Sequence, residues 1–278
     1  MSAASRTVCL LGLPFDGGST FLQGPALAPP IIRRALASES GNLWTEDGHD
    51  LGAAHALHDL GDLALPEDGR QALPLIESAV SHALAAGHPL VCLGGDHSVT
   101  FPILRGFHAH HRDLTILHFD AHPDLYHNLN GDLSHACPFA RIMENGLARR
   151  LIQVGIRTIN QHQLEQARRF GVEVISMRHR EQVAALQLEG PLYISLDLDV
   201  LDPAFAPGIS HYEPGGMSVR DVLDVIQAVR VPIVGADIVE FNPTRDREHQ
   251  TAMVCAKFLK EIAAAMLRDG GEPRTDWV

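Results

Sequence analysis

Short apolar runs alternate along the chain with segments in which apolar residues recur at helical spacing. Strands are predicted for the runs 8–14, 89–95, 114–122, 151–157, 172–177, 191–200 and 231–241. Helices are predicted for the segments 31–36, 71–87, 161–171, 218–229 and 249–267. Continuous apolar strands that alternate with helices are typical of parallel strands buried between layers of helices. The pattern therefore predicts an α/β fold built on a parallel sheet.

Two of the predicted helices carry end signals. Gly87 closes the segment 71–87, and glycine readily adopts the left-handed backbone that ends many helices. Ser218, followed by Asp221, is a candidate N-cap with an acidic residue in the first turn. No repeat, low-complexity block or linker interrupts the pattern, so we expect a single domain over residues 1–278.

The composition indicates which kinds of molecule the protein could bind. Twenty-two lysines and arginines stand against 34 aspartates and glutamates, which gives a formal net charge of −12 without any basic stripe. Nucleic acid is therefore not an expected partner, whereas a small cationic substrate is compatible with the charge. No apolar run approaches the roughly 20 residues that cross a bilayer, so we expect no membrane association. The four cysteines lack a CxxC pair and the N-terminal apolar run is too short for a signal peptide, which favours the cytoplasm.

Three of the predicted strands end in polar turns. In chain order these turns hold Asp96 and His97, then Asp120, His122 and Asp124, then Asp197, Asp199 and Asp202. Ligands of parallel α/β sheets bind outside the carboxyl ends of the strands. Alternate side chains of an extended strand point to one face, so the carboxylates within each turn should project together. Such carboxylates repel each other unless something positive lies between them.

The chemistry of these side chains indicates a metal centre. Oxygen-rich ligation with some imidazole suits Mn²⁺, and less specifically Fe²⁺, Co²⁺ or Ni²⁺, whereas structural zinc prefers a closed set of four Cys or His ligands. So many potential ligands indicate two ions that share carboxylates and activate one water molecule. Each turn alone could be an ordinary strand-end cap, but three such turns after three apolar strands favour the metal centre. Asp96 is better suited to supporting its turn than to binding metal.

The polar turns belong to longer motifs. The segments GGDHS (94–98), FDAHPDLY (119–126), SLDLDVLDPAFAPG (195–208) and GADIVEFNP (235–243) resemble the motifs of the ureohydrolases, the arginase and agmatinase family. The resemblance covers almost the whole chain and is closest to the plant-type arginases. It implies a three-layer α/β/α fold with a mostly parallel central sheet. It also implies two Mn²⁺ per chain, with other divalent metals possible, and we expect a homo-oligomer, a trimer or a hexamer.

The resemblance assigns roles to individual residues. His97 and Asp124 resemble ligands of one ion, His122 and Asp199 resemble ligands of the other, and Asp120 and Asp197 resemble the carboxylates that bridge them. Glu240 resembles the carboxylate that binds the guanidinium group of the substrate, and a fork-to-fork ion pair would orient its carbon. His135 resembles the histidine that carries a proton to the leaving amine.

The resemblance implies hydrolysis of a guanidino compound to urea and an amine, with L-arginine and L-ornithine as the first choice. Glu213, in SHYEPGG, aligns with a glutamate of agmatinase-like proteins. The loop LYHNLNGDLSH offers Asn128 and Asn130 to the tail of the substrate but lacks the Asn- and Thr-rich run of mammalian-type arginases. Agmatine, cleaved to putrescine, or a guanidino acid therefore stays open as the substrate.

Two readings outside this reaction class also stay open. A metal-dependent deacetylase could present Asp and His ligands on a related α/β fold, although the full set of GGDHS and DAHPD motifs argues against it. A metal-dependent binding or regulatory subunit without turnover is the second alternative. The presence of both His135 and Glu240 argues against that alternative.

Overall fold

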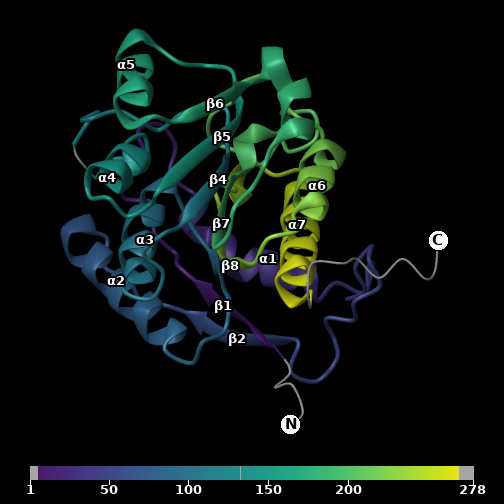
Figure 1. Ribbon diagram of the computed structural model, residues 1–278. Coiled ribbons are helices and arrows are strands. Elements are labelled where there is room, and N and C mark those ends of the chain that lie inside the picture. Colours follow the sequence, from purple (N-terminus) through teal and green to yellow (C-terminus); the bar gives the residue numbers. More distant parts are fainter. Residues whose placement is uncertain (1–5, 132, 269–278) are drawn as a thin grey trace.

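The centre of the molecule is a twisted parallel sheet, seen in the computed structural model, which describes residues 6–131 and 133–268 (Figure 1). Within those residues eight strands form one sheet in the order β2-β1-β3-β8-β7-β4-β5-β6. Every pair of neighbouring strands is parallel. The strands are β1 (Val8–Gly12), β2 (Leu57–Asp62), β3 (Leu90–Leu93), β4 (Thr115–Phe119), β5 (Arg150–Ile156), β6 (Glu173–Ser176), β7 (Leu192–Asp197) and β8 (Ile233–Val239).

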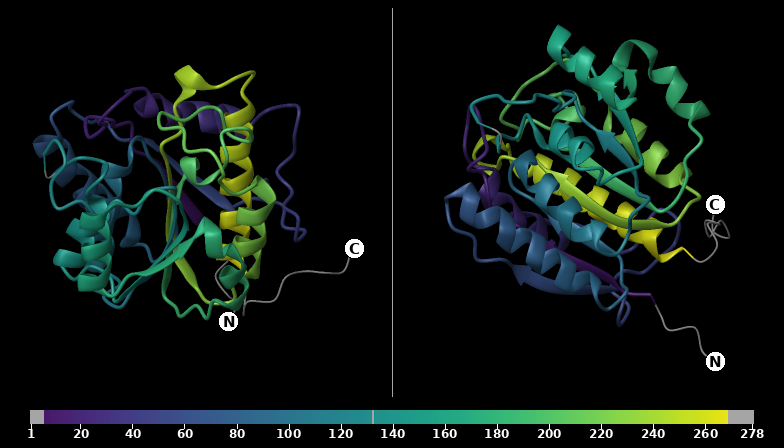
Figure 2. Two further views of the ribbon diagram at one scale, coloured as in Figure 1. Left: turned by 90° about the horizontal axis from the view of Figure 1, so that it is seen from above. Right: turned by 60° about the vertical axis from the view of Figure 1, so that its left-hand side comes forward.

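Helices cover both faces of the sheet (Figures 1 and 2). One face carries α1 (Ala28–Leu36), α6 (Val219–Ala228) and α7 (Gln250–Leu267). The other face carries α2 (Gly69–Leu84), α3 (Thr100–His108), α4 (Pro138–Glu144) and α5 (Gln161–Phe170). Short 3₁₀ helices lie in the connections: η1 (Pro25–Leu27), η2 (His97–Val99), η3 (Met177–Ala185), η4 (Leu198–Val200) and η5 (Pro243–Arg245). The three-layer α/β/α fold that the sequence predicts is confirmed.

The apolar side chains of the strands divide between two cores, one on each face. In β4, Leu117 and Phe119 join the cluster on the side of α1, α6 and α7, whereas Ile116 joins the cluster on the opposite side. All three are fully buried. Burial of each such side chain contributes about 1.5–3 kcal/mol, which explains why continuous apolar runs form these central strands.

The structure adds elements that the apolar pattern does not predict. Strand β2, with the sequence LHDLGD, lies at the edge of the sheet and is largely exposed, so it needs no apolar run. Arg33 of α1 holds it through a salt bridge to Asp59, with a nitrogen–oxygen distance of 2.7 Å, and through another to Asp62. Helices α3 and α4 are short, with nine and seven residues, which leaves little room for a helical repeat of apolar positions.

The predicted end signals hold in part. Ser218 is the N-cap of α6, where its side chain accepts a hydrogen bond from the backbone of Asp221 and the Asp221 side chain accepts one from the backbone of Ser218. Helix α2 ends at Leu84, earlier than predicted, and Gly87 lies beyond it with a φ of +76°. None of the helices in the described part of the chain combines the length and the apolar character that a bilayer crossing requires.

Candidate active site

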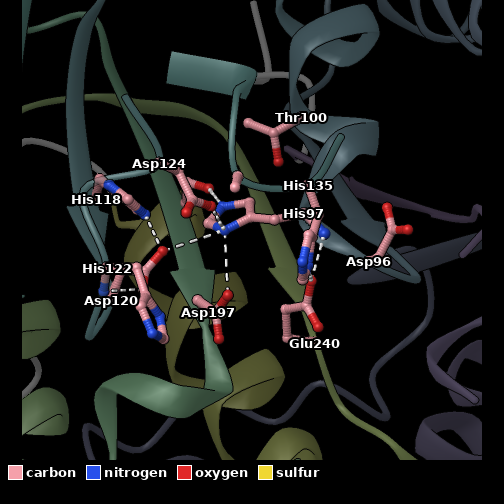
Figure 3. A network of polar contacts seen from close by, with 12 residues as sticks. Asp96, His97, Thr100, His118, Asp120, His122, Asp124, His135, Asp197 and Glu240 are labelled. Carbon is pink, nitrogen blue, oxygen red and sulfur yellow. Dashed lines mark hydrogen bonds and ion pairs between the residues drawn. The ribbon is translucent and has the colours of Figure 1, made fainter. Parts of the chain in front are cut away.

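Polar side chains from four neighbouring strands meet at the carboxyl edge of the sheet (Figure 3). His97 begins η2 after β3, Glu240 follows β8, Asp197 ends β7 and Asp120 follows β4. Strands β3, β8, β7 and β4 are consecutive in the sheet. Residues that are far apart in the sequence therefore lie at one site, as the strand-end rule predicts.

The first group of potential ligands surrounds a nitrogen of His97. The Nδ1 atom of His97 lies 3.2 Å from Asp120 Oδ2, 3.2 Å from Asp124 Oδ2 and 3.1 Å from Asp197 Oδ2. This nitrogen is buried, and within the described residues it has no hydrogen-bond partner. Lone pairs face each other at such distances only when a proton or a cation lies among them. We call these four residues the His97 cluster.

The second group is smaller and shares Asp120 with the first. His122 Nδ1 lies 2.9 Å from Asp199 Oδ2 and 3.4 Å from Asp120 Oδ1. Asp120 thus turns one oxygen to this His122 cluster and the other to His97. Imidazole and carboxylate donors in this combination fit a divalent cation such as Mn²⁺.

The electrostatics of the site favour positive charge. Burial alone would lower the pKa of His97, but the adjacent carboxylates of Asp120, Asp124 and Asp197 raise this pKa well above its ordinary value. Burial likewise opposes the charged form of His122, yet Asp199 and Asp120 raise the pKa of His122 to about 12. Without a cation the clusters therefore hold protons, and a bound metal would replace those protons.

The potential metal ligands that follow β4 and β7 lie in tight turns and not in extended strands. The predicted strand 114–122 ends at Phe119, and the backbone of Asp124 has a φ of +50°. Strand β7 ends at Asp197, whose side chain accepts a hydrogen bond from the backbone of Asp199, at 2.8 Å. Asp197 then contacts His97 while Asp199 contacts His122, so the prediction that these two carboxylates share a strand face is wrong. Asp120 and Asp124 do project together, and both contact Nδ1 of His97.

A buried chain of hydrogen bonds orients His97. Its Nε2 atom lies 3.0 Å from the hydroxyl of Ser195, and this hydroxyl donates to Asp237 Oδ1 at 2.7 Å. Asp237 also accepts hydrogen bonds from Tyr193 and Thr100. Because the Ser195 hydroxyl donates its proton to Asp237, its oxygen can only accept a hydrogen bond from Nε2 of His97. Nε2 therefore carries the ring proton, and Nδ1 keeps a lone pair that can bind a metal. Ser195 and Asp237 lie inside the quoted motifs, but the sequence gives no sign of this pairing.

His118 is another residue that sequence reasoning missed. It precedes Asp120 by two positions, and its Nε2 atom lies 2.8 Å from Asp120 Oδ2. Its ring stacks on Phe139, with the ring centres 3.8 Å apart, and its Nδ1 atom lies 3.0 Å from Gln153. The spacing to Asp120 is the signal that could have identified it, because side chains two apart in a strand share a face.

Glu240 and His135 form a buried pair beside the ligand clusters. His135 Nδ1 lies 2.8 Å from Glu240 Oε1, which also accepts a hydrogen bond from the backbone of His97 at 2.8 Å. Burial alone would lower the pKa of His135, but Glu240 raises it to about 9. Glu240 has a φ of +63°, a costly conformation for glutamate that is found preferentially at functional sites.

A cavity of about 200 Å³ joins the pair to the ligands. Its walls include Asp124, Asp197 and Asp199 together with Glu240, His135, His122 and His211. A larger cavity, of about 770 Å³, lies between η3 and α6. We place the site in the smaller cavity because the buried carboxylates and imidazoles converge there.

The residues predicted to hold the tail of the substrate lie outside the walls of this cavity. Leu129 lines the cavity, whereas its exposed neighbours Asn128 and Asn130 do not. Likewise His211 lines it and Glu213, two residues later, does not. Contacts of Glu213, Asn128 and Asn130 with a substrate therefore stay predictions. The role of His211 as a wall of the cavity was missed by sequence reasoning.

Arg157 anchors the loop that carries His211 and Glu213. Its Nε atom donates to the backbone oxygen of Glu213 at 2.8 Å, and its Nη2 atom donates to the backbone oxygen of Asp199 at 2.6 Å. The same guanidinium also reaches the backbone oxygens of Gly155, Val200 and Leu201. One side chain thus ties this loop to the turn that carries a predicted metal ligand.

Known proteins with similar sequences and structures identify the family of this chain. The chain is 47% identical to "Arginase 1, mitochondrial" of Arabidopsis thaliana over 282 residues, which span 95% of this chain and 82% of that relative. The solved structure of arginase from Medicago truncatula matches with a TM-score of 0.90 and 42% identity, over 94% of this chain and 88% of that chain. An agmatinase of Bacillus anthracis is 33% identical over 264 residues, which span 92% of this chain and 90% of that relative. The Arginase family model matches residues 6–265, so the resemblance predicted from the motifs is confirmed and the chain belongs to the arginase family.

Proposed function

We propose that this protein is a binuclear manganese amidinohydrolase that cleaves L-arginine to L-ornithine and urea. The observation that carries this proposal is the position of Glu240. Its carboxylate lines the same cavity as Asp124, Asp197 and Asp199 and accepts a hydrogen bond from the backbone of His97. A guanidinium group bound to Glu240 would lie beside the predicted metal ligands. Relatives that are 44–47% identical and named arginase support L-arginine as the substrate.

Six residues would hold the metal. We assign His97 and Asp124 to one ion, His122 and Asp199 to the other, and Asp120 and Asp197 to both. The two oxygens of Asp120 face the two clusters, which supports its bridging assignment. When bound, the divalent cations would lower the pKa of a water molecule and so supply a nucleophile near neutral pH.

Glu240 and His135 would perform the remaining tasks. Glu240 would pair with the guanidinium group through charge-assisted hydrogen bonds and hold its carbon toward the clusters. After the oxygen of water adds to that carbon, the bond to the leaving amine breaks, and this amine must take up a proton. His135 lines the same cavity and would donate that proton.

A panel of guanidino compounds tests the proposal. Purified protein loaded with Mn²⁺ is incubated with L-arginine, agmatine and a guanidino acid, and urea is measured together with ornithine and putrescine. Urea and ornithine from L-arginine are the expected products. Putrescine as the preferred product would identify an agmatinase, the second candidate, which the agmatinase relative and Glu213 support. Release of acetate from an acetylated polyamine would identify a deacetylase, and no product from any compound would identify a binding protein.

Three predictions concern the whole protein. We propose that residues 1–278 form a single domain, that the protein works in the cytoplasm, and that it assembles as a trimer or a hexamer. Light scattering after gel filtration measures the mass of the assembly, and a monomer would contradict the last of these predictions.

Glu213→Gln should weaken binding of the preferred substrate. We propose that this carboxylate, on the loop anchored by Arg157, reaches the α-ammonium group of arginine. Loss of one charge-assisted hydrogen bond predicts a KM raised roughly 10- to 100-fold, with a smaller change in kcat because Glu240 holds the reacting group. The ratio of activity on arginine to activity on agmatine should shift as well.

The control for this variant is Glu181→Gln, at an exposed carboxylate on η3. Steady-state kinetics on both substrates supply the measurement. If Glu213→Gln leaves both KM values and the ratio of arginine to agmatine activity unchanged, Glu213 does not bind the tail of the substrate. That role would then fall to Asn128, Asn130 or His211.

Binding of Mn²⁺ should release protons at neutral pH. In the metal-free protein the nearby carboxylates raise the pKa values of His97 and His122 above the ordinary value of histidine. Both rings therefore carry a second proton and a positive charge at pH 7. A ligand nitrogen must lose its proton to bind metal, so affinity should rise with pH and activity should fall below about pH 6. Calorimetry in two buffers with different ionisation enthalpies should detect a net release of protons on metal binding. Metal binding without proton release would contradict these ligand assignments.

A further inference from the structure

Both ring nitrogens of His135 have hydrogen-bond partners, and they come from opposite ends of the chain. Nδ1 lies 2.8 Å from Glu240 Oε1. Nε2 lies 2.8 Å from the hydroxyl of Thr20 and 3.2 Å from the backbone nitrogen of the same residue. The backbone nitrogen of His135 also donates to the backbone oxygen of Gly18 at 3.0 Å. The segment 18–20 therefore holds an imidazole that follows it by 115 residues.

These contacts define the neutral form of the ring. The backbone N–H of Thr20 donates to Nε2, so this atom carries a lone pair and the ring proton lies on Nδ1. The proton on Nδ1 is then donated to Glu240, an arrangement that suits a buried carboxylate. In this state the hydroxyl of Thr20 can also donate to Nε2.

The protonated form of the ring needs a different partner. A ring that gains a second proton at Nε2 becomes a donor there, and a backbone N–H cannot accept a hydrogen bond. The hydroxyl of Thr20 can rotate and accept it, because a hydroxyl is both a donor and an acceptor. Among the described residues, this hydroxyl is therefore the partner that can serve Nε2 of His135 in both protonation states.

We propose that Thr20 is a positioning residue whose hydroxyl allows His135 to bind and release a proton during each turnover. This inference rests on the proposed function, in which His135 protonates the leaving amine. Thr20 lines the cavity of about 200 Å³ together with His135 and Glu240. The contact between its hydroxyl and the ring of His135 therefore lies beside the space that the substrate would occupy.

Other charged and titratable groups near His135 also affect its protonation. Glu240 follows β8, Asp96 follows β3 and Asp124 follows β4, and each of these carboxylates favours the charged form of the ring. His211, on the loop before α6, lies with its ring centre 5.2 Å from that of His135. A substitution at Thr20 leaves these four side chains in place, so a change in the behaviour of His135 would report on the hydroxyl.

The test compares Thr20→Val, which keeps the size of the side chain and the backbone N–H but removes the hydroxyl, with Thr20→Ser, which keeps the hydroxyl. In the Mn²⁺-loaded enzyme, Thr20→Val should lower kcat about 10- to 100-fold, with metal content and KM near those of the unmodified enzyme. Loss of the acceptor destabilises the protonated ring, so the alkaline limb of the kcat–pH profile should move to lower pH by about 1–2 units. Thr20→Ser should restore both properties.

Ser19→Ala is the matched control. It removes the neighbouring hydroxyl, which donates to Asp96 at 3.2 Å and not to His135, and it should keep a near-normal kcat and pH profile. An unchanged kcat and alkaline limb in Thr20→Val would overturn the proposal. Equal losses in Thr20→Val and Thr20→Ser would also overturn it, because the shape of the side chain and not the hydroxyl would then be responsible.

A second measurement does not depend on turnover. Diethyl pyrocarbonate modifies neutral imidazole, and mass spectrometry of the peptide that contains His135 gives the pH dependence of its modification in the loaded protein. The midpoint should fall in Thr20→Val and return in Thr20→Ser, even if no guanidino compound in the panel is cleaved. An unchanged midpoint would overturn the role of Thr20, whereas a failed panel with a shifted midpoint would overturn only the proposed reaction.

Discussion

Asp120→Asn should abolish urea production and reduce the metal content of the protein. Asp120 is fully buried, and its two oxygens face His97 and His122. Among the described residues its carboxylate contacts both histidines, and it is assigned to both proposed ions, so both ions would lose a negative charge together. An amide keeps the size of the side chain but cannot neutralise two cations, and its N–H group would face the lone pair of a ligand nitrogen.

The variant should remain folded, because removal of one of several adjacent carboxylates relieves their mutual repulsion. Metal analysis after gel filtration and a urea assay are the two measurements, with a thermal melt as the check on folding. The matched control is Asp202→Asn in the same DLDVLDP segment, where the side chain accepts hydrogen bonds from the backbones of Ala204 and Gly215 outside the cavity. Two ions per chain and near-normal turnover in Asp120→Asn would refute the bridging assignment.

His135→Ala should lower kcat by about 10²–10⁴-fold, the usual contribution of a general acid or base, while metal content stays unchanged. The ring contacts Glu240 and Thr20 and makes no contact with either ligand nitrogen among the described residues. Its removal therefore takes away a proton donor without removing a ligand.

His127→Ala is the control for this variant, because that ring lies nearby in sequence but its side chain is 63% exposed. Turnover of L-arginine and the metal content are measured for both variants. A loss of metal in His135→Ala, or full activity, would show that the proposed role is wrong.

The apolar pattern predicts most of the fold because the central strands are buried on both faces. Each of β3, β4, β7 and β8 lies within a predicted apolar run, and the polar residues that follow them mark the edge of the sheet where ligands bind. Strand β2 could not be predicted in this way. Its residues are mostly exposed, and the partner that holds it, Arg33, lies in α1.

The candidate site could be predicted as a set of residue types but not as a geometry. The sequence identifies Asp120 and Asp197 because each directly follows apolar residues. No spacing rule predicts that both side chains turn to Nδ1 of His97 while Asp199, two residues after Asp197, turns to His122. The contacts between His97 and Ser195 and between Thr20 and His135 join residues 98 and 115 positions apart. Only the arrangement of the strands brings such residues together, and the linear sequence gives no local sign of it.

The anchor formed by Arg157 has an evolutionary consequence. Its guanidinium group binds backbone oxygens of the loop and of the ligand turn, including those of Glu213 and Asp199. Every type of residue has a backbone oxygen, so substitutions in this loop can reshape the wall of the cavity without breaking the anchor. The carboxylates and imidazoles on the other walls of the cavity can stay in place while this wall changes.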